Sequence, residues 1–310
     1  MTDIHPKPYF QENEMSRTSH GFNRSTQSAP TTEFLTLVEE GEVATITLNR
    51  PEVMNALSVD LSREFAESVE YIRDQDHLHI VVIKGSGGNF CVGDDLSEMA
   101  GGEWGNPNAV FRRVRYYQDM ANTLEELDKI TISAVDGNCV GGGLEITMAC
   151  DFVICTERAR WGMPEVDWGI TPGWGGTTRM VRLIGRRMTK EINLLGALHS
   201  AKRGVDLGLF NRVVPNDQLD DAVTGLVELL KIKNNQGLRQ LKFIINKNAE
   251  ADLYTAQGFE ALQGAYSASV LAANLVPDAD DAHGWTAYAE KDPESEILKR
   301  RQAALNFWVD

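Results

Sequence analysis

Two glutamates, Glu145 and Glu165, lie in glycine-rich surroundings where a carboxyl group could exchange protons. Glu145 follows three consecutive glycines at residues 141–143, and Glu165 follows Pro164 in a stretch, residues 161–176, that is dense in apolar and glycine residues. A carboxyl with little access to water has a raised pKa, so it can act as an acid or a base near neutral pH. Because glutamates are most often exposed, a simple surface position is the alternative for Glu165.

The main-chain amides of two glycine-bearing loops could hold a negative oxygen. Residues 135–145 read as a strand that runs into the three glycines and then into a helix that begins near Leu144. Glycine lets a ligand approach the backbone closely, and the first N–H groups of a helix have no partner within it. Residues 85–96 form a second such loop, so each loop could donate one amide to a shared oxyanion. A tight turn without a ligand is the alternative for the three glycines.

The elements that must position these residues alternate between strand and helix. Short β-branched runs predict strands, and longer segments with apolar residues on one face predict helices. The alternation over the first two-thirds of the chain favours an α/β fold in which successive strand–helix turns stack. Ser58 is a candidate N-cap. The predicted strands cover residues 43–48, 79–84, 131–135 and 151–156, and the predicted helices cover residues 58–73, 109–127, 219–231, 236–249 and 294–309.

The chain divides into three predicted parts. Residues 1–32 are expected to be a disordered N-terminal extension without the apolar segment of a secretory signal. Residues 33–217 are expected to form the α/β core, and residues 218–310 a helical C-terminal region that packs or assembles separately. The aromatic pair near the C-terminus, Phe307 and Trp308, could pack on the chain's own core or cover a neighbouring subunit.

Composition excludes several classes of function. The 310 residues carry a net charge of -15, which argues against a nucleic-acid partner because phosphates require a basic face. No apolar run is long enough to span a bilayer. The four cysteines, Cys91, Cys139, Cys150 and Cys155, lack metal-ligand spacing, so we expect free thiols, no metal and a cytoplasmic protein.

The chain resembles the enoyl-CoA hydratase/isomerase family, also called the crotonase family, over residues 35–291. Six motifs occur in the family's order, which makes coincidence a poor explanation. The resemblance implies a crotonase-like spiral of ββα turns with a helical C-terminal trimerisation region, assembled as a homotrimer or a dimer of trimers. The motifs lie at residues 48–57, 90–99, 136–151, 163–179, 207–215 and 284–291.

The resemblance also assigns roles residue by residue. Glu145 and Glu165 match the two catalytic glutamates of the family's hydratases, and the main-chain N–H groups of Asp94 and Gly142 match its oxyanion hole. Asp94 departs from the small residue often found there, and its carboxylate could repel an anionic intermediate. The implied substrate and CoA contacts are Ala56, Asp94, Asp95, Leu96 and Gly142.

The expected activity is the hydration of a 2-enoyl-CoA to a 3-hydroxyacyl-CoA, with no cofactor beyond the CoA of the substrate. Adding water to a conjugated thioester requires a base on the water, a proton donor at Cα and stabilisation of the enolate oxygen. Two glutamates and two amides meet these needs. The alternatives are an enoyl-CoA isomerase, a hydroxycinnamoyl-CoA hydratase-lyase, whose relatives tend to lack a glutamate at the position of Glu145, and a non-catalytic assembly subunit.

Overall fold

The computed structural model describes residues 28–99, 105–274 and 295–308 of the chain. Most of the N-terminal extension predicted for residues 1–32 lies outside the described residues. From residue 33 onward the chain alternates strands and helices, and after residue 217 the described residues contain helices and no strands.

The main sheet has six strands, five of which run parallel. β4 is one of the two central strands, and it is buried at every position, as expected of a parallel strand covered on both faces. β1 adds to β2 as an antiparallel edge. In spatial order the strands are β1 (Leu35–Glu40), β2 (Val43–Leu48), β3 (Ile80–Gly85), β4 (Ile130–Val135), β6 (Phe152–Thr156) and β9 (Arg212–Val214).

A second, smaller sheet positions the segments that carry the two glutamates. It consists of β5 (Asn138–Val140), β7 (Arg160–Gly162) and β8 (His199–Ser200). β5 and β7 pair in parallel, so their carboxyl ends lie at the same edge of the sheet. The main-chain N–H of Gly141 extends this pairing by donating to the carbonyl of Gly162.

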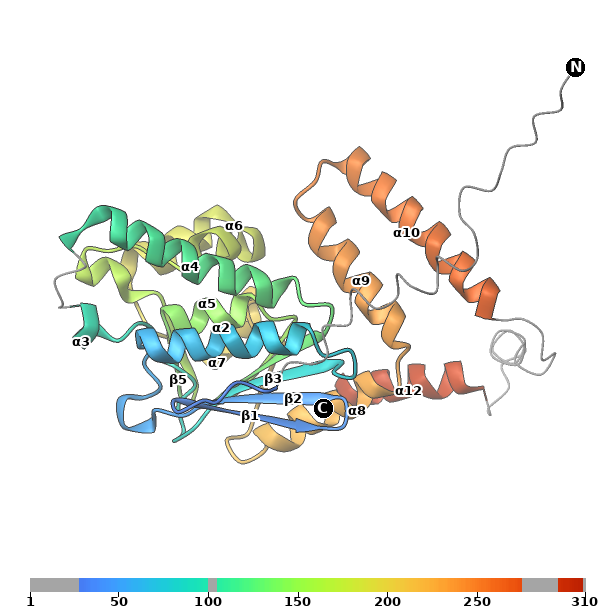
Figure 1. Cartoon of the computed structure of the whole chain (residues 1–310), viewed down its shortest axis with the longest axis horizontal. Coiled ribbons are helices and arrows are strands. Elements are labelled where there is room, and N and C mark those ends of the chain that lie inside the picture. Colours follow the sequence, from blue (N-terminus) through green and yellow to red (C-terminus); the bar gives the residue numbers. More distant parts are fainter. Residues whose placement is uncertain (1–27, 100–104, 275–294, 309–310) are drawn as a thin grey trace, which may run out of the picture.

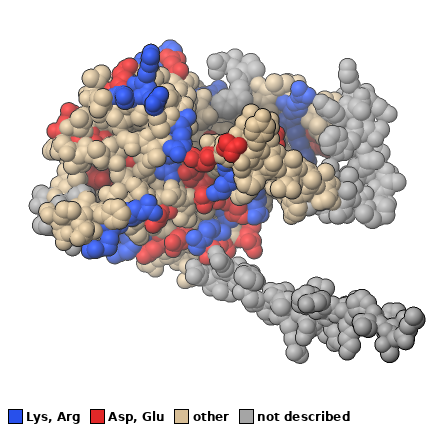
Figure 2. All heavy atoms as spheres, turned by 90° about the horizontal axis from the view of Figure 1, so that it is seen from above, with Lys and Arg blue, Asp and Glu red and all other residues tan. Residues whose placement is uncertain are grey.

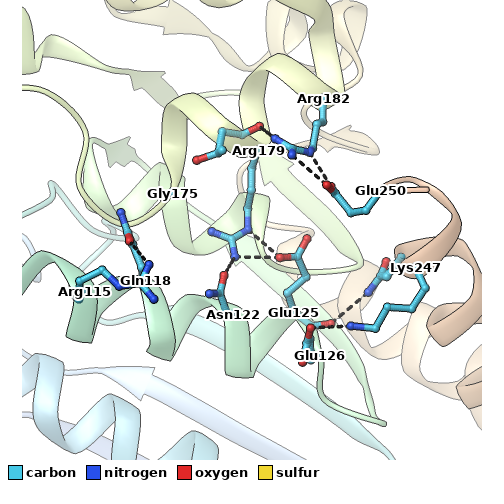
Figure 3. Close-up of a pocket in the computed structure, with 12 residues that line it drawn as sticks. Arg115, Gln118, Asn122, Glu125, Glu126, Gly175, Arg179, Arg182, Lys247 and Glu250 are labelled. Atoms are coloured by element: carbon cyan, nitrogen blue, oxygen red, sulfur yellow. Dashed lines mark hydrogen bonds and ion pairs between the residues drawn. The ribbon is translucent and has the colours of Figure 1, made fainter. Parts of the chain in front are cut away.

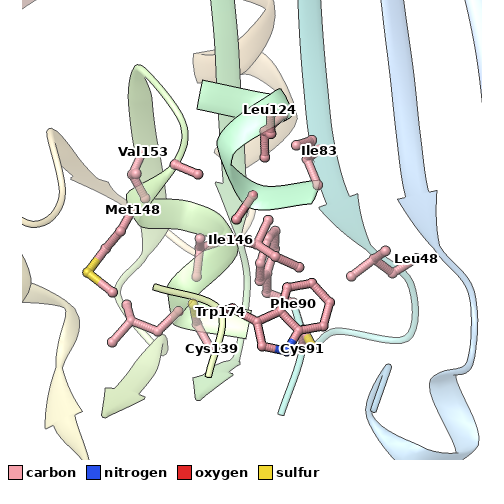
Figure 4. Packing of buried hydrophobic residues seen from close by; sticks show 14 of the residues in the cluster. Leu48, Ile83, Phe90, Cys91, Leu124, Cys139, Ile146, Met148, Val153 and Trp174 are labelled. Carbon is pink, nitrogen blue, oxygen red and sulfur yellow. The ribbon is translucent and has the colours of Figure 1, made fainter. Parts of the chain in front are cut away.

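Helices cover one face of the main sheet (Figure 1). They are α2 (Val59–Arg73), α4 (Pro107–Glu125), α5 (Gly142–Met148) and α6 (Gly176–Leu195). Ser58 caps α2, because its side chain accepts a hydrogen bond from the N–H of Leu61. All seven residues of α5 are buried. Figure 4 shows part of the core around it, including Ile146, Ile83 and Trp174.

The C-terminal helices divide into two pairs. α8 (Leu219–Lys231) packs its buried Val223, Leu226 and Leu230 against the main sheet, and α12 (Glu296–Trp308) packs on α8. α9 (Asn235–Asn248) and α10 (Leu253–Asn274) contact each other and project from the core in Figure 1. The Phe307 ring lies against this chain's own core, with Arg212 over its face.

The predicted strands and helices occur within two residues of their expected bounds, with α5 also beginning two residues early. Four strands, β1, β7, β8 and β9, were not predicted, and three of these have only two or three residues, whereas β5 lies where a strand was expected to run into the three glycines. The remaining elements are η1 (Pro51–Val53), α3 (Leu96–Met99), η3 (Pro164–Trp168) and α7 (Ala201–Leu207).

Candidate active site

Glu145 and Glu165 converge because they follow two paired strands. β5 continues through Gly141 into α5, whose first turn carries Glu145. β7 continues through Pro164 into η3, which carries Glu165. A Cβ placed on Gly141 would lie 3.0 Å from Oε1 of Glu165, so this carboxyl lies directly against the start of α5. The structure therefore brings the two predicted carboxyls together.

The Glu145 carboxyl is enclosed and held in one orientation. Glu145 is only 1% exposed. Oε1 accepts hydrogen bonds from the main-chain N–H groups of Trp174, at 2.8 Å, and Gly176, at 2.5 Å. Burial above all, and then the nearby Glu165, raise the pKa of Glu145 to about 8, although the two donated hydrogen bonds oppose the shift.

Glu165 is less enclosed but has an orphaned oxygen. Burial is the main cause that raises its pKa to about 7, and the Asp94 carboxyl adds to the shift. Its Oε2 atom is buried and has no hydrogen-bond partner among the described residues. A buried oxygen without a partner is costly, so it is suited to a proton or to a group of the substrate. Glu165 is therefore half-buried, with one oxygen enclosed, and is not the fully exposed residue considered as the alternative.

Two main-chain amides lie on the two glycine-bearing loops beside the carboxyls. The N–H groups of Asp94 and Gly142 make no hydrogen bond to the described residues. Their loops are in contact, because a Cβ on Gly93 would lie 3.1 Å from the N atom of Gly142. The bridge between Leu57 and Asp94 fixes the first loop, and Gly142 begins α5. Two free amides on adjacent loops form a geometry suited to an oxyanion.

The side chain of Asp94 contributes a third carboxyl, which stood out in the sequence only as a departure from the family pattern. Its Oδ1 accepts a hydrogen bond from the indole Nε1 of Trp174 at 3.1 Å. Burial raises the pKa of Asp94 to about 6, although that hydrogen bond and the charge of Arg113 lower it. The Asp94 carboxyl in turn raises the pKa of both Glu145 and Glu165.

The motif at residues 48–57 is hydrogen-bonded to the glycine-bearing loop at residues 85–96, which carries Asp94. Asn55 is fully buried with a left-handed φ of 58°, and its Nδ2 donates to the carbonyls of Ser86, Asn89 and Phe90. Short polar asparagine tolerates this conformation better than most residues do. These bonds fasten the motif to the loop that ends in Asp94.

Three of the predicted CoA contacts, Ala56, Asp95 and Leu96, lie on these two segments. Arg50 donates to the carbonyl of Ala56 at 2.6 Å and pairs with Asp95 at 2.9 Å. The Ser97 hydroxyl, then Arg50, hold the pKa of Asp95 below its usual range. Leu96 is 45% exposed and can contact a ligand. The structure thus places Ala56, Asp95 and Leu96 together next to the Asp94 loop.

Trp174 and Arg179 support the site, although no sequence pattern indicated this role. Trp174 is fully buried, stacks on Tyr117 with ring centroids 4.5 Å apart and donates to two of the three carboxyls. Arg179 donates to the Trp174 carbonyl, to Glu125 and to Asn122. No local sequence pattern indicated these hydrogen bonds, because they join segments that are far apart in the chain.

A charged pocket of about 640 Å³ lies between α4, α6 and α9 (Figure 3). Its cations are paired with its anions: Arg179 with Glu125, and Lys247 with Glu126. Neither Glu145 nor Glu165 lines it. The pocket is therefore separate from the cluster of carboxyls, although Gly175, which lines it, lies between the two residues whose main-chain N–H groups donate to Glu145.

Other chemistry finds little support in the described part of the chain. No group of three or more His, Cys, Asp or Glu side chains there could hold a metal ion. The four cysteines are free, and burial raises the pKa of Cys91, Cys150 and Cys155 to about 12, so they stay protonated. None of the described helices combines the length and the hydropathy that a membrane span requires. Figure 2 shows acidic and basic side chains intermixed on the visible face.

The chain is similar to several known proteins over most of its length. The short-chain-enoyl-CoA hydratase of Clostridium acetobutylicum is 36% identical over 73% of this chain and 85% of the relative. The crotonyl-CoA hydratase of Syntrophomonas wolfei is 32% identical over 86% and 99%. The structure of a Thermobifida fusca protein in complex with acetoacetyl-CoA matches with a TM-score of 0.73 at 30% identity, over 78% and 99%. These likenesses confirm the crotonase fold. The model of the family described as Enoyl-CoA hydratase/isomerase matches residues 38–295, and the chain belongs to this family.

Proposed function

We propose that this chain is an enoyl-CoA hydratase, which adds water reversibly to a 2-enoyl-CoA and yields a 3-hydroxyacyl-CoA. The observation that carries the proposal is the convergence of Glu145 and Glu165, both with raised pKa values, beside two unpaired amides. The names of the two curated relatives, a short-chain-enoyl-CoA hydratase and a crotonyl-CoA hydratase, support the same reaction.

The two glutamates supply the acid and the base of the reaction. Carboxyls this close titrate as a pair, and pKa values of about 8 and about 7 leave the pair with a shared proton near neutral pH. One member takes a proton from water as its oxygen attacks Cβ, and the other gives a proton to Cα. The proton taken and the proton given balance over one turnover.

The amides of Asp94 and Gly142 stabilise the intermediate. Attack at Cβ moves an electron pair through the conjugated system onto the thioester oxygen, which becomes an enolate. Two fixed N–H groups directed at this oxygen favour the charged intermediate over the neutral ground state. Removing one such donor typically costs ~3–4 kcal/mol in the transition state. The CoA portion lies along Ala56, Asp95 and Leu96 in this proposal.

The proposed assembly is a homotrimer or a dimer of trimers built through the C-terminal region. α9 and α10 carry large apolar side chains that the described part of the chain leaves uncovered, among them Tyr254, which is 83% exposed, and Leu262, which is 71% exposed. Exposed apolar surface of this extent is typical of a protein interface. Light scattering should give a mass three or six times that of the 34.4 kDa chain.

Hydration of crotonyl-CoA by the purified protein tests the reaction. The absorbance of the conjugated thioester should fall with the wild type, and 3-hydroxybutyryl-CoA should accumulate. Glu145→Gln and Glu165→Gln should each lower kcat by about 10²- to 10⁴-fold, because the amide cannot exchange a proton. Glu157→Gln is a matched control, since Glu157 is exposed on a turn away from the site.

The same assay separates hydration from its alternatives. A 3-enoyl-CoA should gain the conjugated absorbance with an isomerase, and crotonyl-CoA would then lose none. The proposed mechanism is wrong if crotonyl-CoA is hydrated at the wild-type rate by the variant in which both glutamates are replaced by glutamine.

A further inference from the structure

The carboxyl of Asp94 lies beside the oxygen that its own main-chain amide would bind. Only the Cα and Cβ atoms separate this amide from the carboxyl carbon. The indole of Trp174, which contacts the Asp94 carboxyl, also lies against Gly142: a Cβ on Gly142 would be 3.6 Å from Nε1. The carboxyl is therefore on the side of the loop that faces the second amide.

A carboxylate in this place would oppose the proposed reaction. It would put a negative charge next to an enolate oxygen in a site with little water, where like charges repel strongly. Two further carboxyls, Glu145 and Glu165, already crowd the region. A neutral carboxylic acid would have the opposite effect, because its O–H can donate a hydrogen bond.

Trp174 selects which oxygen of Asp94 carries the proton. An indole N–H is only a donor, so the Oδ1 atom that it contacts must act as an acceptor. The proton of a neutral Asp94 therefore resides on Oδ2, since the hydrogen bond from Trp174 is the one that the described residues make to this carboxyl, and it reaches Oδ1. Oδ2 is the oxygen left to face the substrate.

We propose that Asp94 works as a neutral acid whose Oδ2–H is a third hydrogen-bond donor to the enolate oxygen, beside the amides of Asp94 and Gly142. This rests on the proposed hydratase function. The proton remains on Asp94 throughout, so the group stabilises charge without transferring a proton. The residue that departs from the family pattern would thus strengthen the oxyanion site.

The charged and titratable groups around Asp94 act in both directions. Arg113 on α4 and the Trp174 hydrogen bond favour its ionised form, whereas burial and Glu98 on α3 favour the neutral form. The Asp94 charge also acts on Tyr117 of α4, on Cys91, and on the two glutamates. Together these place the pKa of Asp94 at about 6, before any substrate displaces water.

Asp94→Asn and Asp94→Ala test the proposal. The asparagine can keep both interactions, since its Oδ1 can accept from Trp174 and its Nδ2 can donate to the oxyanion. Alanine can make neither. With crotonyl-CoA at pH 6, Asp94→Ala should lower kcat by about ten- to a hundredfold, and Asp94→Asn should stay within about threefold of the wild type. Asp60→Asn, at an exposed carboxyl, controls for the change in net charge.

The dependence of kcat on pH shows whether the neutral or the ionised form of Asp94 favours the reaction. The wild type should lose activity as rising pH removes the Asp94 proton, whereas Asp94→Asn keeps its donor, so the ratio of Asp94→Asn to wild-type kcat should grow from pH 6 to pH 9. Equal loss in the asparagine and alanine variants, or a ratio that does not change with pH, would overturn the proposal.

Acetoacetyl-CoA provides a readout that needs no hydration. Its enolate absorbs differently from its keto form, and a site with a third donor should favour the bound enolate in the wild type and in Asp94→Asn more than in Asp94→Ala. The same enolate fraction in all three proteins contradicts the role of Asp94. A wild type that selects the enolate but does not hydrate crotonyl-CoA contradicts the proposed function alone.

Discussion

The main-chain N–H of Trp174 donates to Oε1 of Glu145 at 2.8 Å, which ties the orientation of a buried carboxyl to a turn 29 residues away in sequence. The indole of the same tryptophan donates to Asp94. One residue thus sets the positions of two carboxyls, and its ring is fixed by stacking on Tyr117. Changes at Trp174 should therefore affect protonation in the site as well as stability.

Trp174→Phe should separate these effects, because it removes the indole donor and retains an aromatic ring and the main-chain N–H. The pKa of Asp94 should rise, since the lost hydrogen bond lowers it. The basic limb of the kcat profile should then move to higher pH, and the free energy of unfolding should fall by about 1–2 kcal/mol. Rates of crotonyl-CoA hydration measured across the pH range give the kcat profile, and urea unfolding gives the free energy of unfolding.

Trp161→Phe is the matched control for this change. Trp161 is equally buried, and its Nε1 donates to the carbonyl of Ser200 at 2.9 Å, away from the carboxyls. It should lose similar stability with an unchanged pH profile. A shift of the profile in both variants, or in neither, would show that the Trp174 indole does not control Asp94.

Stability should decrease as pH rises through the range in which Glu145 ionises. Its pKa is about 8 in the folded protein, against an ordinary value of 4.5. Between these values the folded state binds more protons than the unfolded state, so the stabilisation is fully present below pH 4.5 and is lost as pH approaches 8. The loss is on the order of a few kcal/mol, at about 1.4 kcal/mol for each pKa unit.

Glu145→Gln should abolish most of this dependence, because the amide cannot ionise and can still accept the two main-chain hydrogen bonds. The variant should equal the wild type in urea unfolding at pH 5 and exceed it in stability at pH 9. Glu67→Gln, at an exposed carboxyl of α2, should follow the wild type at both pH values. A variant less stable than the wild type at pH 9 would show that the buried carboxylate is not a burden to the fold.

The fold was predictable where local patterns are long. Helix α2 follows from its apolar spacing and from Ser58, and β2 from its β-branched residues. Strands β5, β7 and β8 have two or three residues, which is too few for alternation to show, yet β5 and β7 bring the glutamates together. The family resemblance located Glu145 and Glu165, and the pairing of these short strands explains why they meet.

The hydrogen bonds of the site could not be predicted because they connect distant segments. Trp174 and Asp94 are 80 residues apart, and no local pattern encodes that contact. The start of α5 was expected near Leu144 because glycine disfavours helix, but the helix begins at Gly142. Tertiary packing overrides the propensity here: a side chain on Gly143 would collide with the backbone of Cys91.

Gly143→Ala should therefore destabilise the protein strongly. The new Cβ would lie 2.4 Å from the carbonyl oxygen of Cys91, a backbone atom that cannot move without shifting the oxyanion loop. We expect a loss of about 1–3 kcal/mol or more in the free energy of unfolding, with reduced kcat. Gly258→Ala in α10 meets no atom within 4 Å and should gain up to about 1 kcal/mol. Equal stability of the two variants would show that α5 can shift freely.

Arg179→Lys should weaken the turn that orients Glu145. Arg179 is 8% exposed, and its guanidinium donates at once to the Trp174 carbonyl, to Glu125 and to Asn122. A lysine ammonium cannot reproduce this planar set of donors, so at least one buried acceptor loses its partner. The free energy of unfolding should fall by about 1–3 kcal/mol, and kcat should fall with little change in KM.

Arg182→Lys, one turn along α6, is the control for that substitution. Arg182 is half exposed and pairs with Glu250 on the surface, and exposed ion pairs contribute little. Its unfolding free energy should change by less than about 1 kcal/mol and its kcat should be unchanged. If Arg179→Lys and Arg182→Lys behave alike in urea unfolding and in crotonyl-CoA hydration, Glu145 owes its orientation to Trp174 and Gly176 without help from Arg179.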